Sequence, residues 1–163
     1  MLKKFGIEIK WAFVFLGMTL AWMVLEKLSG LHGKYIDYHL YLTNLYAIPA
    51  VWVYVLALRD KKKRYYGGQM SFKQGFLCGV IITAIVTIFS PLSQWIISYV
   101  ITPEYFPNVI KRSVELGYYK TTAEAEANFN FENYAKQSTM AALVMGLVTS
   151  AIVAFFARTK NKA

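Results

Sequence analysis

Residues 74–101 carry no charged side chain, and this stretch constrains the fold of the chain more than any other feature. A helix rises about 1.5 Å per residue, so the stretch would be roughly 40 Å long as a helix. The hydrocarbon core of a bilayer is about 30 Å thick, so such a helix is long enough to cross it. Trp95 and Tyr99 lie near one end, and aromatic pairs of this kind favour the membrane interface. The sequence therefore predicts a protein that spans a membrane.

Three further apolar stretches are long enough to cross a bilayer. We expect spans at residues 5–27, 39–58, 74–101 and 137–157, all within one membrane domain that covers residues 1–163. Hydrophobic residues make up 56% of the chain, which fits a set of spans better than a water-soluble core. The predicted fold class is all-α, an integral membrane four-helix bundle with a helical extracytoplasmic insert between the third and fourth spans.

Positive charge is distributed unevenly between the two sides that these spans define. Twelve of the 18 Lys and Arg residues, against two acids, fall near the termini or in residues 59–73. The positive-inside rule then predicts that both termini are cytoplasmic, in a bacterial inner membrane. Topology accounts for the net charge of +9, so we expect the lipid bilayer and not nucleic acid as a partner.

The polar segment at residues 102–136 is the expected extracytoplasmic insert. Its Thr-Pro-Glu triplet at residues 102–104 is typical of a helix start, and Gly117 is expected to end that helix. Thr121 and Glu124 have capping-box spacing and predict a second helix, which we expect to run unbroken into the fourth span. The segment is rich in aromatic residues, which predicts burial against the bundle, the membrane surface or a partner.

Small residues recur at every fourth position in the third and fourth spans, a pattern typical of closely packed transmembrane helices. The predicted helix-packing positions are Gly75, Gly79, Ala142, Gly146, Ser150 and Ala154. Gly17 begins a shorter pair of small residues in the first span. Pro49 and Pro91 each leave a carbonyl free within a span and are expected to kink it. The hydroxyls of Thr83 and Thr87 are expected to bond local carbonyls.

Two polar groups are candidate sites. His32, Asp37 and His39, with Glu26 across the loop, are weak candidates for a metal site because zinc binds histidine and carboxylate ligands. Their spacing matches no recognised motif, and an ordinary interfacial role is the alternative. The candidates for contact with anionic lipid head groups are Arg59, Lys61, Lys62, Lys63 and Arg64, although topology alone also explains this run.

The sequence shows no nucleophile–base–acid set, phosphate loop or nucleotide fingerprint. We therefore expect neither an enzyme nor a bound cofactor. The single cysteine, Cys78, excludes an intrachain disulfide and is expected to be a small core residue.

The segment at residues 67–106, from a glycine pair to just beyond the third span, resembles a known family. The residues that carry the resemblance are Gly67, Gly68, Ser71, Phe72, Gly75, Phe76, Gly79, Thr102, Pro103, Glu104 and Phe106. They are similar to the pattern of a bacterial four-span membrane protein family catalogued as domain of unknown function 4199. The resemblance implies the four-span layout with a polar helical insert, and it implies no activity or catalytic residue.

Two functional classes follow from these features. The first is a structural or accessory protein that uses the insert to contact a membrane protein or a second copy of itself. The alternative is a small oligomeric transporter or channel built around the kinked second and third spans. The first is favoured because the insert is the only sizeable polar surface, and because ion coupling usually needs an ionisable residue deep in a span.

Overall fold

The computed structural model describes the backbone of residues 2–159 and the side chains of residues 5–159, and this part of the chain is helical without strands. The elements are α1 (Leu2–Leu28), α2 (Ile36–Leu42), the 3₁₀ helix η1 (Thr43–Tyr46), α3 (Ala47–Arg64), α4 (Phe72–Ile96), the π-helix η2 (Ile97–Ile101), α5 (Tyr105–Glu115), α6 (Thr122–Asn128) and α7 (Phe131–Ala157). The described residues include four helical stretches long and apolar enough to cross a membrane: Phe5–Leu28, Ile36–Arg64, Phe72–Ile101 and Thr122–Ala157. The predicted all-α, multi-pass membrane fold is confirmed.

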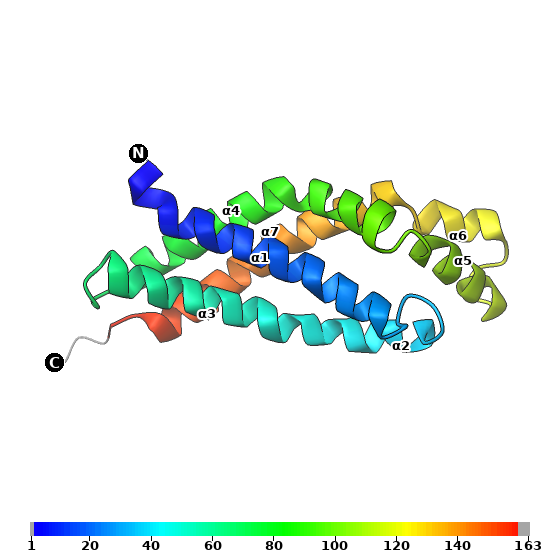
Figure 1. The fold of residues 1–163 in the computed structure, drawn as a ribbon, viewed down its shortest axis with the longest axis horizontal. Helices are drawn as coiled ribbons and strands as arrows, with labels where there is room; N and C mark the ends of the chain where they lie inside the picture. The colour runs from blue at the N-terminus through cyan, green and yellow to red at the C-terminus, as the bar shows by residue number, and fades with distance from the viewer. Residues whose placement is uncertain (1, 160–163) are drawn as a thin grey trace.

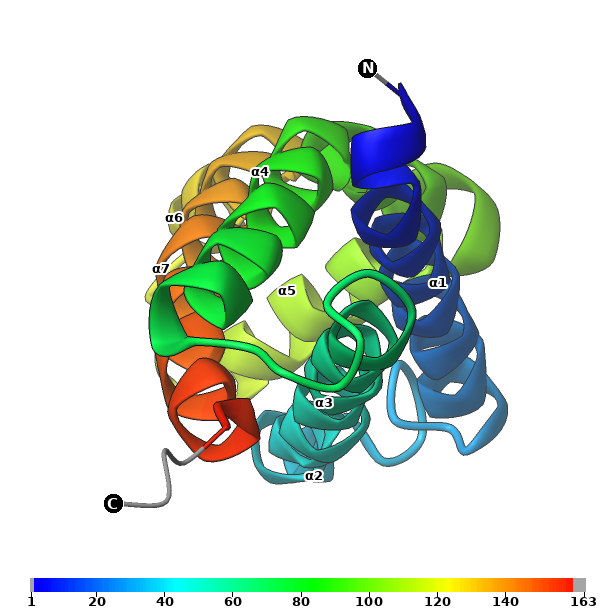
Figure 2. The same cartoon turned by 90° about the vertical axis from the view of Figure 1, so that its left-hand side faces the viewer.

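The four long helices α1, α3, α4 and α7 form an elongated bundle (Figure 1). One end of the bundle holds the start of α1, the α3–α4 loop and the end of α7, and we call it the basic end. The opposite end holds α5 and α6, which we call the cap. A view from the basic end shows the four helices around a common centre, with α5 behind them (Figure 2).

The small residues of α4 and α7 face each other along the bundle. A Cβ placed on Gly75 would lie 3.2 Å from the Cβ of Ala154, and one placed on Gly146 would lie 2.5 Å from Cγ2 of Thr83. The two backbones therefore approach as closely as small residues allow, as is typical of tightly packed membrane helices. Gly17 differs, because a Cβ there would meet nothing within 4 Å. Its predicted role in helix contact is wrong.

A kink at each proline stays a prediction, and the helix bounds show where each proline lies. Pro49 is in the first turn of α3, directly after η1, where a missing N–H costs no helical hydrogen bond. Pro91 lies inside α4, which continues to Ile96 and then into η2. The Thr83 hydroxyl bonds the Gly79 carbonyl at 2.9 Å as expected, whereas the Thr87 hydroxyl is buried with no hydrogen-bond partner among the described residues.

The structure corrects two helix boundaries around the cap. The first cap helix begins at Tyr105, with Glu104 in the N-cap position and no side-chain cap, and not at the predicted triplet. Its expected end is right, because Gly117 adopts a left-handed φ of 75°. The second helix begins as predicted, with Thr121 accepting a hydrogen bond from the Glu124 N–H. It does not run unbroken into the fourth span, because Asn130 is extended and caps a new helix, α7.

The basic run belongs to α3 and not to a loop. Lys61, Lys62, Lys63 and Arg64 form the last turn of this helix, where positive charge is favoured by the helix dipole. The next span begins at a complete capping box, in which the Ser71 hydroxyl accepts from the Gln74 N–H and the Gln74 side chain accepts from the Ser71 N–H.

Candidate functional site

The cap is fixed to the bundle by three polar contacts. Arg112 of α5 donates two hydrogen bonds to the Asp37 carboxylate of α2, each 2.7 Å long. The amide of Asn108 donates to the His32 carbonyl at 2.8 Å. Nζ of Lys27, near the end of α1, lies 3.4 Å from Oε1 of Glu104, the N-cap residue of α5. Bidentate and charge-assisted bonds of this kind hold a fixed geometry, so the cap is docked on the bundle.

Glu26, His32 and His39 lie together beneath the cap. Glu26 is near the end of α1, His32 is in the following loop and His39 is on α2. The Nε2 atom of His32 is 3.1 Å from Oε2 of Glu26, and Nε2 of His39 is 3.4 Å from the same oxygen. Trp22 donates a 2.6 Å hydrogen bond to the other oxygen of Glu26. These contacts orient one carboxylate oxygen toward two histidine rings.

The cluster is buried. The side chains of Glu26 and His32 are 2% and 3% exposed, and that of His39 is 20% exposed. Tyr105 of α5 covers both histidines, with its ring centroid 5.2 Å from that of His32 and 5.1 Å from that of His39. Burial, the neighbouring Tyr134 and their mutual hydrogen bond raise the pKa of Tyr105 well above its usual range. This residue is therefore a neutral phenol that packs on the cluster.

Asp37 is not part of this cluster, so its place among the candidate ligands is corrected. Asp37 and His39 are two residues apart on the short helix α2. Residues at that spacing lie on different faces of a helix. His39 faces Glu26, whereas Asp37 binds Arg112 of the cap.

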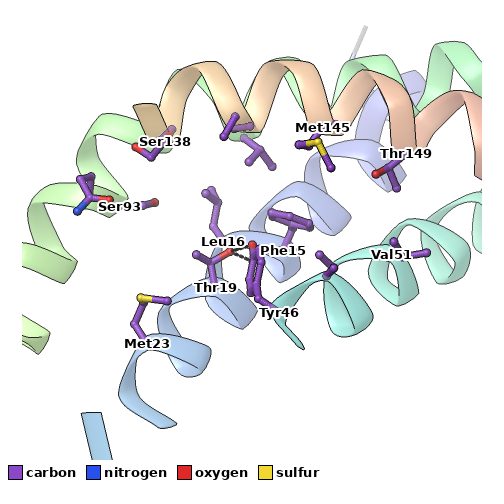
Figure 3. Close-up of a pocket in the computed structure, with 18 of the residues that line it drawn as sticks. Phe15, Leu16, Thr19, Met23, Tyr46, Val51, Ser93, Ser138, Met145 and Thr149 are labelled. Atoms are coloured by element: carbon purple, nitrogen blue, oxygen red, sulfur yellow. Dashed lines mark hydrogen bonds between the residues drawn. The ribbon is translucent and has the colours of Figure 1, made fainter. Parts of the chain in front are cut away.

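The second feature is a cavity of about 400 Å³ between the long helices. Its lining comes from all four, with Leu16 and Thr19 on α1, Val51 on α3 and Met145 and Thr149 on α7 drawn around it in Figure 3. The lining is largely apolar with scattered hydroxyl groups. Within it, the hydroxyls of Thr19 and Tyr46 bond each other at 2.7 Å.

The cavity is closed toward the basic end by a polar contact among three helices. The Tyr54 hydroxyl of α3 lies 2.8 Å from Oγ1 of Thr83 on α4, which lies 3.4 Å from Oγ of Ser150 on α7. Thr83 and Ser150 are both fully buried. The cavity therefore ends within the bundle, and in the described part of a single chain it forms a pocket and not a continuous pore.

The profile of the family described as protein of unknown function, DUF4199, matches residues 10–159. The chain belongs to this family. The match covers the first span from residue 10 onward, the other three spans, the Glu26–His32–His39 cluster and the cap, and it confirms the resemblance noted from the sequence. No curated protein and no solved structure matches the chain significantly.

The basic end of this DUF4199 chain holds an ion pair that the sequence does not reveal. Nζ of Lys61 lies 2.8 Å from Oε1 of Glu8, and both side chains are buried. Glu8 and Lys61 are far apart in the chain, so no local pattern indicates their contact. The expectation that Lys61 contacts lipid head groups is corrected, because its ammonium points into the bundle.

The other residues of the basic run have different surroundings. Lys62 donates to the Ala157 carbonyl at 2.9 Å and so caps the end of α7. Arg64 pairs with Asp60 at 2.7 Å while its side chain stays largely exposed. Arg59 and Lys63 are exposed. Contact with anionic head groups remains a prediction for these exposed residues.

Proposed function

We propose that this DUF4199 protein is an accessory protein of the bacterial inner membrane, which contacts another membrane protein through its cap. The proposal depends on orientation. The positive-inside rule places the basic end in the cytoplasm and the cap on the extracytoplasmic side. An extracytoplasmic cap is the part of the chain best placed to meet a partner outside the bilayer.

One observation carries the proposal: the cap is held on the bundle at one part, its base, and exposes large side chains at another, its tip. The base of the cap is held by Arg112 and Asn108, as described above. The tip presents Leu116 and Tyr118, which are 45% and 76% exposed. Large side chains on a docked support lose little entropy on binding, and tyrosine is enriched at the centres of protein interfaces.

Photocrosslinking in native membranes tests this function. A benzophenone amino acid replaces Tyr118, and membranes are irradiated before solubilisation. We expect a discrete protein adduct, which mass spectrometry identifies as another membrane protein. An adduct with a second copy of the chain would instead identify the partner as the protein itself. A homo-oligomer is the other kind of partner expected from the sequence.

Ile88 provides the matched control. It is 74% exposed, close to the value for Tyr118, but it lies on α4 within the span Phe72–Ile101. The same photoreactive residue at position 88 is expected to label lipid. If position 118 also labels only lipid, or gives no adduct, the cap is not a contact surface and the proposed function is wrong.

A small transporter is the second candidate function, and the cavity favours it. A largely apolar pocket with scattered hydroxyls suits an amphipathic or apolar substrate. Ala50→Phe would place a ring in the cavity lining. Native mass spectrometry of protein extracted in mild detergent should then show loss of a co-purifying small molecule that the wild type retains. Ala84→Phe, at an exposed position on α4 outside the lining, is the control.

A further inference from the structure

The carboxylate of Glu26 lacks a permanent positive partner. Its ion pairs within the described residues are with His32 and His39 only. The side chain of Glu26 is 2% exposed. A buried carboxylate is costly unless a charge or hydrogen bonds compensate it. His32, His39, Trp22 and Thr43 supply hydrogen bonds, and none of these side chains carries a permanent charge.

The geometry matches the ligand set of a tetrahedral metal ion. Zinc binds histidine nitrogen and carboxylate oxygen at about 2.0–2.1 Å, which separates neighbouring ligand atoms by roughly 3.3 Å in a tetrahedron. The two Oε2–Nε2 distances in the cluster are 3.1 and 3.4 Å. One ligand atom from each of Glu26, His32 and His39 lies within 4.8 Å of the other two. Two of the three separations therefore fit one shared ion, and the two histidine nitrogens, which lie within 4.8 Å of each other, would move together around it.

We propose that Glu26, His32 and His39 bind a divalent transition-metal ion of the zinc class. Two histidines and one carboxylate are borderline ligands, which favour zinc over magnesium or calcium. The site has three protein ligands, so a water molecule completes the tetrahedron. His39 is the most exposed ligand, and the ion enters past its ring.

Outer contacts hold the Glu26 carboxylate and the backbone of His32 in place. The hydrogen bond from Trp22 to Oε1 holds the Glu26 carboxylate so that Oε2 faces the histidines. Asn108 holds the loop through the His32 carbonyl, and Tyr105 packs on both rings. Nδ1 of His32 is buried without a partner among the described residues. With the ion on Nε2, this nitrogen carries the ring proton, and we expect it to bond a second water molecule.

Metal binding by the purified chain tests the site. The full chain is isolated through a histidine-free tag, treated with chelator, reconstituted in nanodiscs and dialysed against Zn²⁺. We expect one Zn²⁺ per chain by elemental analysis, retained in excess Mg²⁺. Co²⁺ in place of Zn²⁺ should give the strong visible absorption of a tetrahedral site. Loss of a single outer contact to a metal ligand costs 10–100-fold in affinity, so loss of the ligand in His39→Gln should weaken binding at least about 100-fold.

Glu132→Gln is the matched control, because it removes an exposed carboxylate whose ion pair is with Lys136 on α7. This variant should bind Zn²⁺ like the wild type. Trp22→Phe leaves all three ligands in place and should weaken binding about 10–100-fold. Because it keeps the ligands, it tests the site even if Glu26→Gln fails to fold. Equal binding by wild type and His39→Gln, an equal loss in Glu132→Gln, or displacement by Mg²⁺ would overturn the proposal. None of these results bears on the partner of the cap.

Discussion

Gly79 of α4 lies directly against Ser150 of α7, and a Cβ at Gly79 would come 2.6 Å from the Cβ of Ser150. Ser150 cannot turn away freely, because its hydroxyl bonds the Gly146 carbonyl at 2.6 Å and lies 3.4 Å from Oγ1 of Thr83. The contact therefore couples the closest approach of two helices to the polar contact that closes the cavity. Any side chain at position 79 must separate α4 from α7.

Gly79→Leu should therefore destabilise the bundle strongly. Overpacking a well-packed interior costs about 1–3 kcal/mol, and leucine against a backbone lies at the upper end. Thermal unfolding in detergent measures the effect. Gly17→Leu is the matched control, because a Cβ at Gly17 meets nothing within 4 Å, and it should unfold near the wild-type temperature. Equal unfolding temperatures for the two variants would show that α4 and α7 do not pack closely at Gly79.

The spans could be predicted from sequence because hydropathy over some 20 residues reports a property that does not depend on tertiary contacts. The contact between the small residues of α4 and α7 could be predicted for a similar reason, because small residues at every fourth position lie on one face of a helix. Helix ends could also be predicted at Ser71, Gly117 and Thr121. At these positions the residue's own side chain or φ angle forms the cap or turn, so no distant contact is needed.

The candidate site could be predicted only in part, because it depends on where one short helix begins. We expected the second span to start at residue 39, which left Asp37 in a loop and free to join the histidines. The helix starts at Ile36, and the two-residue spacing then separates Asp37 from His39. Contacts between residues far apart in the chain, such as Glu8 and Lys61, are the other feature that the sequence could not predict. Each looks like an interfacial charge in its own segment, and only the tertiary fold brings them together.

The Arg112–Asp37 pair should hold the cap on the bundle. Asp37→Asn removes the charge that accepts both hydrogen bonds, and we expect faster amide exchange in α5 with unchanged exchange in α4 and α7. The pair is partly exposed, so its contribution to overall stability is expected to be small. Hydrogen exchange with mass spectrometry in nanodiscs resolves these segments. Glu132→Gln, which removes an exposed pair with Lys136 on α7, is the control and should leave α5 unchanged.

The proposed topology can be tested with single cysteines in a Cys78→Ser background. Cys78 is 2% exposed, so its removal changes no reactive surface. Tyr118→Cys, on the cap, should react with an impermeant maleimide in intact spheroplasts. Lys63→Cys, at the exposed basic end, should react only after lysis. The opposite order would place the basic end outside, in conflict with the positive-inside rule.

The last prediction concerns the buried ion pair at the basic end. Lys61→Met removes the ammonium and leaves the Glu8 carboxylate buried without it, so we expect a loss of about 3–5 kcal/mol in the free energy of unfolding. Adding Glu8→Gln to Lys61→Met removes the uncompensated negative charge of Glu8, and most of the lost stability should return. Lys63→Met, which removes an exposed charge from the same turn of α3, is the control and should change stability little.

Denaturant unfolding in mixed micelles compares the free energy of unfolding of Lys61→Met and of Glu8→Gln with that of the double variant. A stabilising interaction between the two side chains appears as non-additivity, because each single change leaves one charge buried. If Lys61→Met is no less stable than Lys63→Met, the Glu8 carboxylate is not held in the bundle interior. If the double variant is as unstable as the sum of the singles, the two charges act independently, and the 2.8 Å contact does not account for the burial of either.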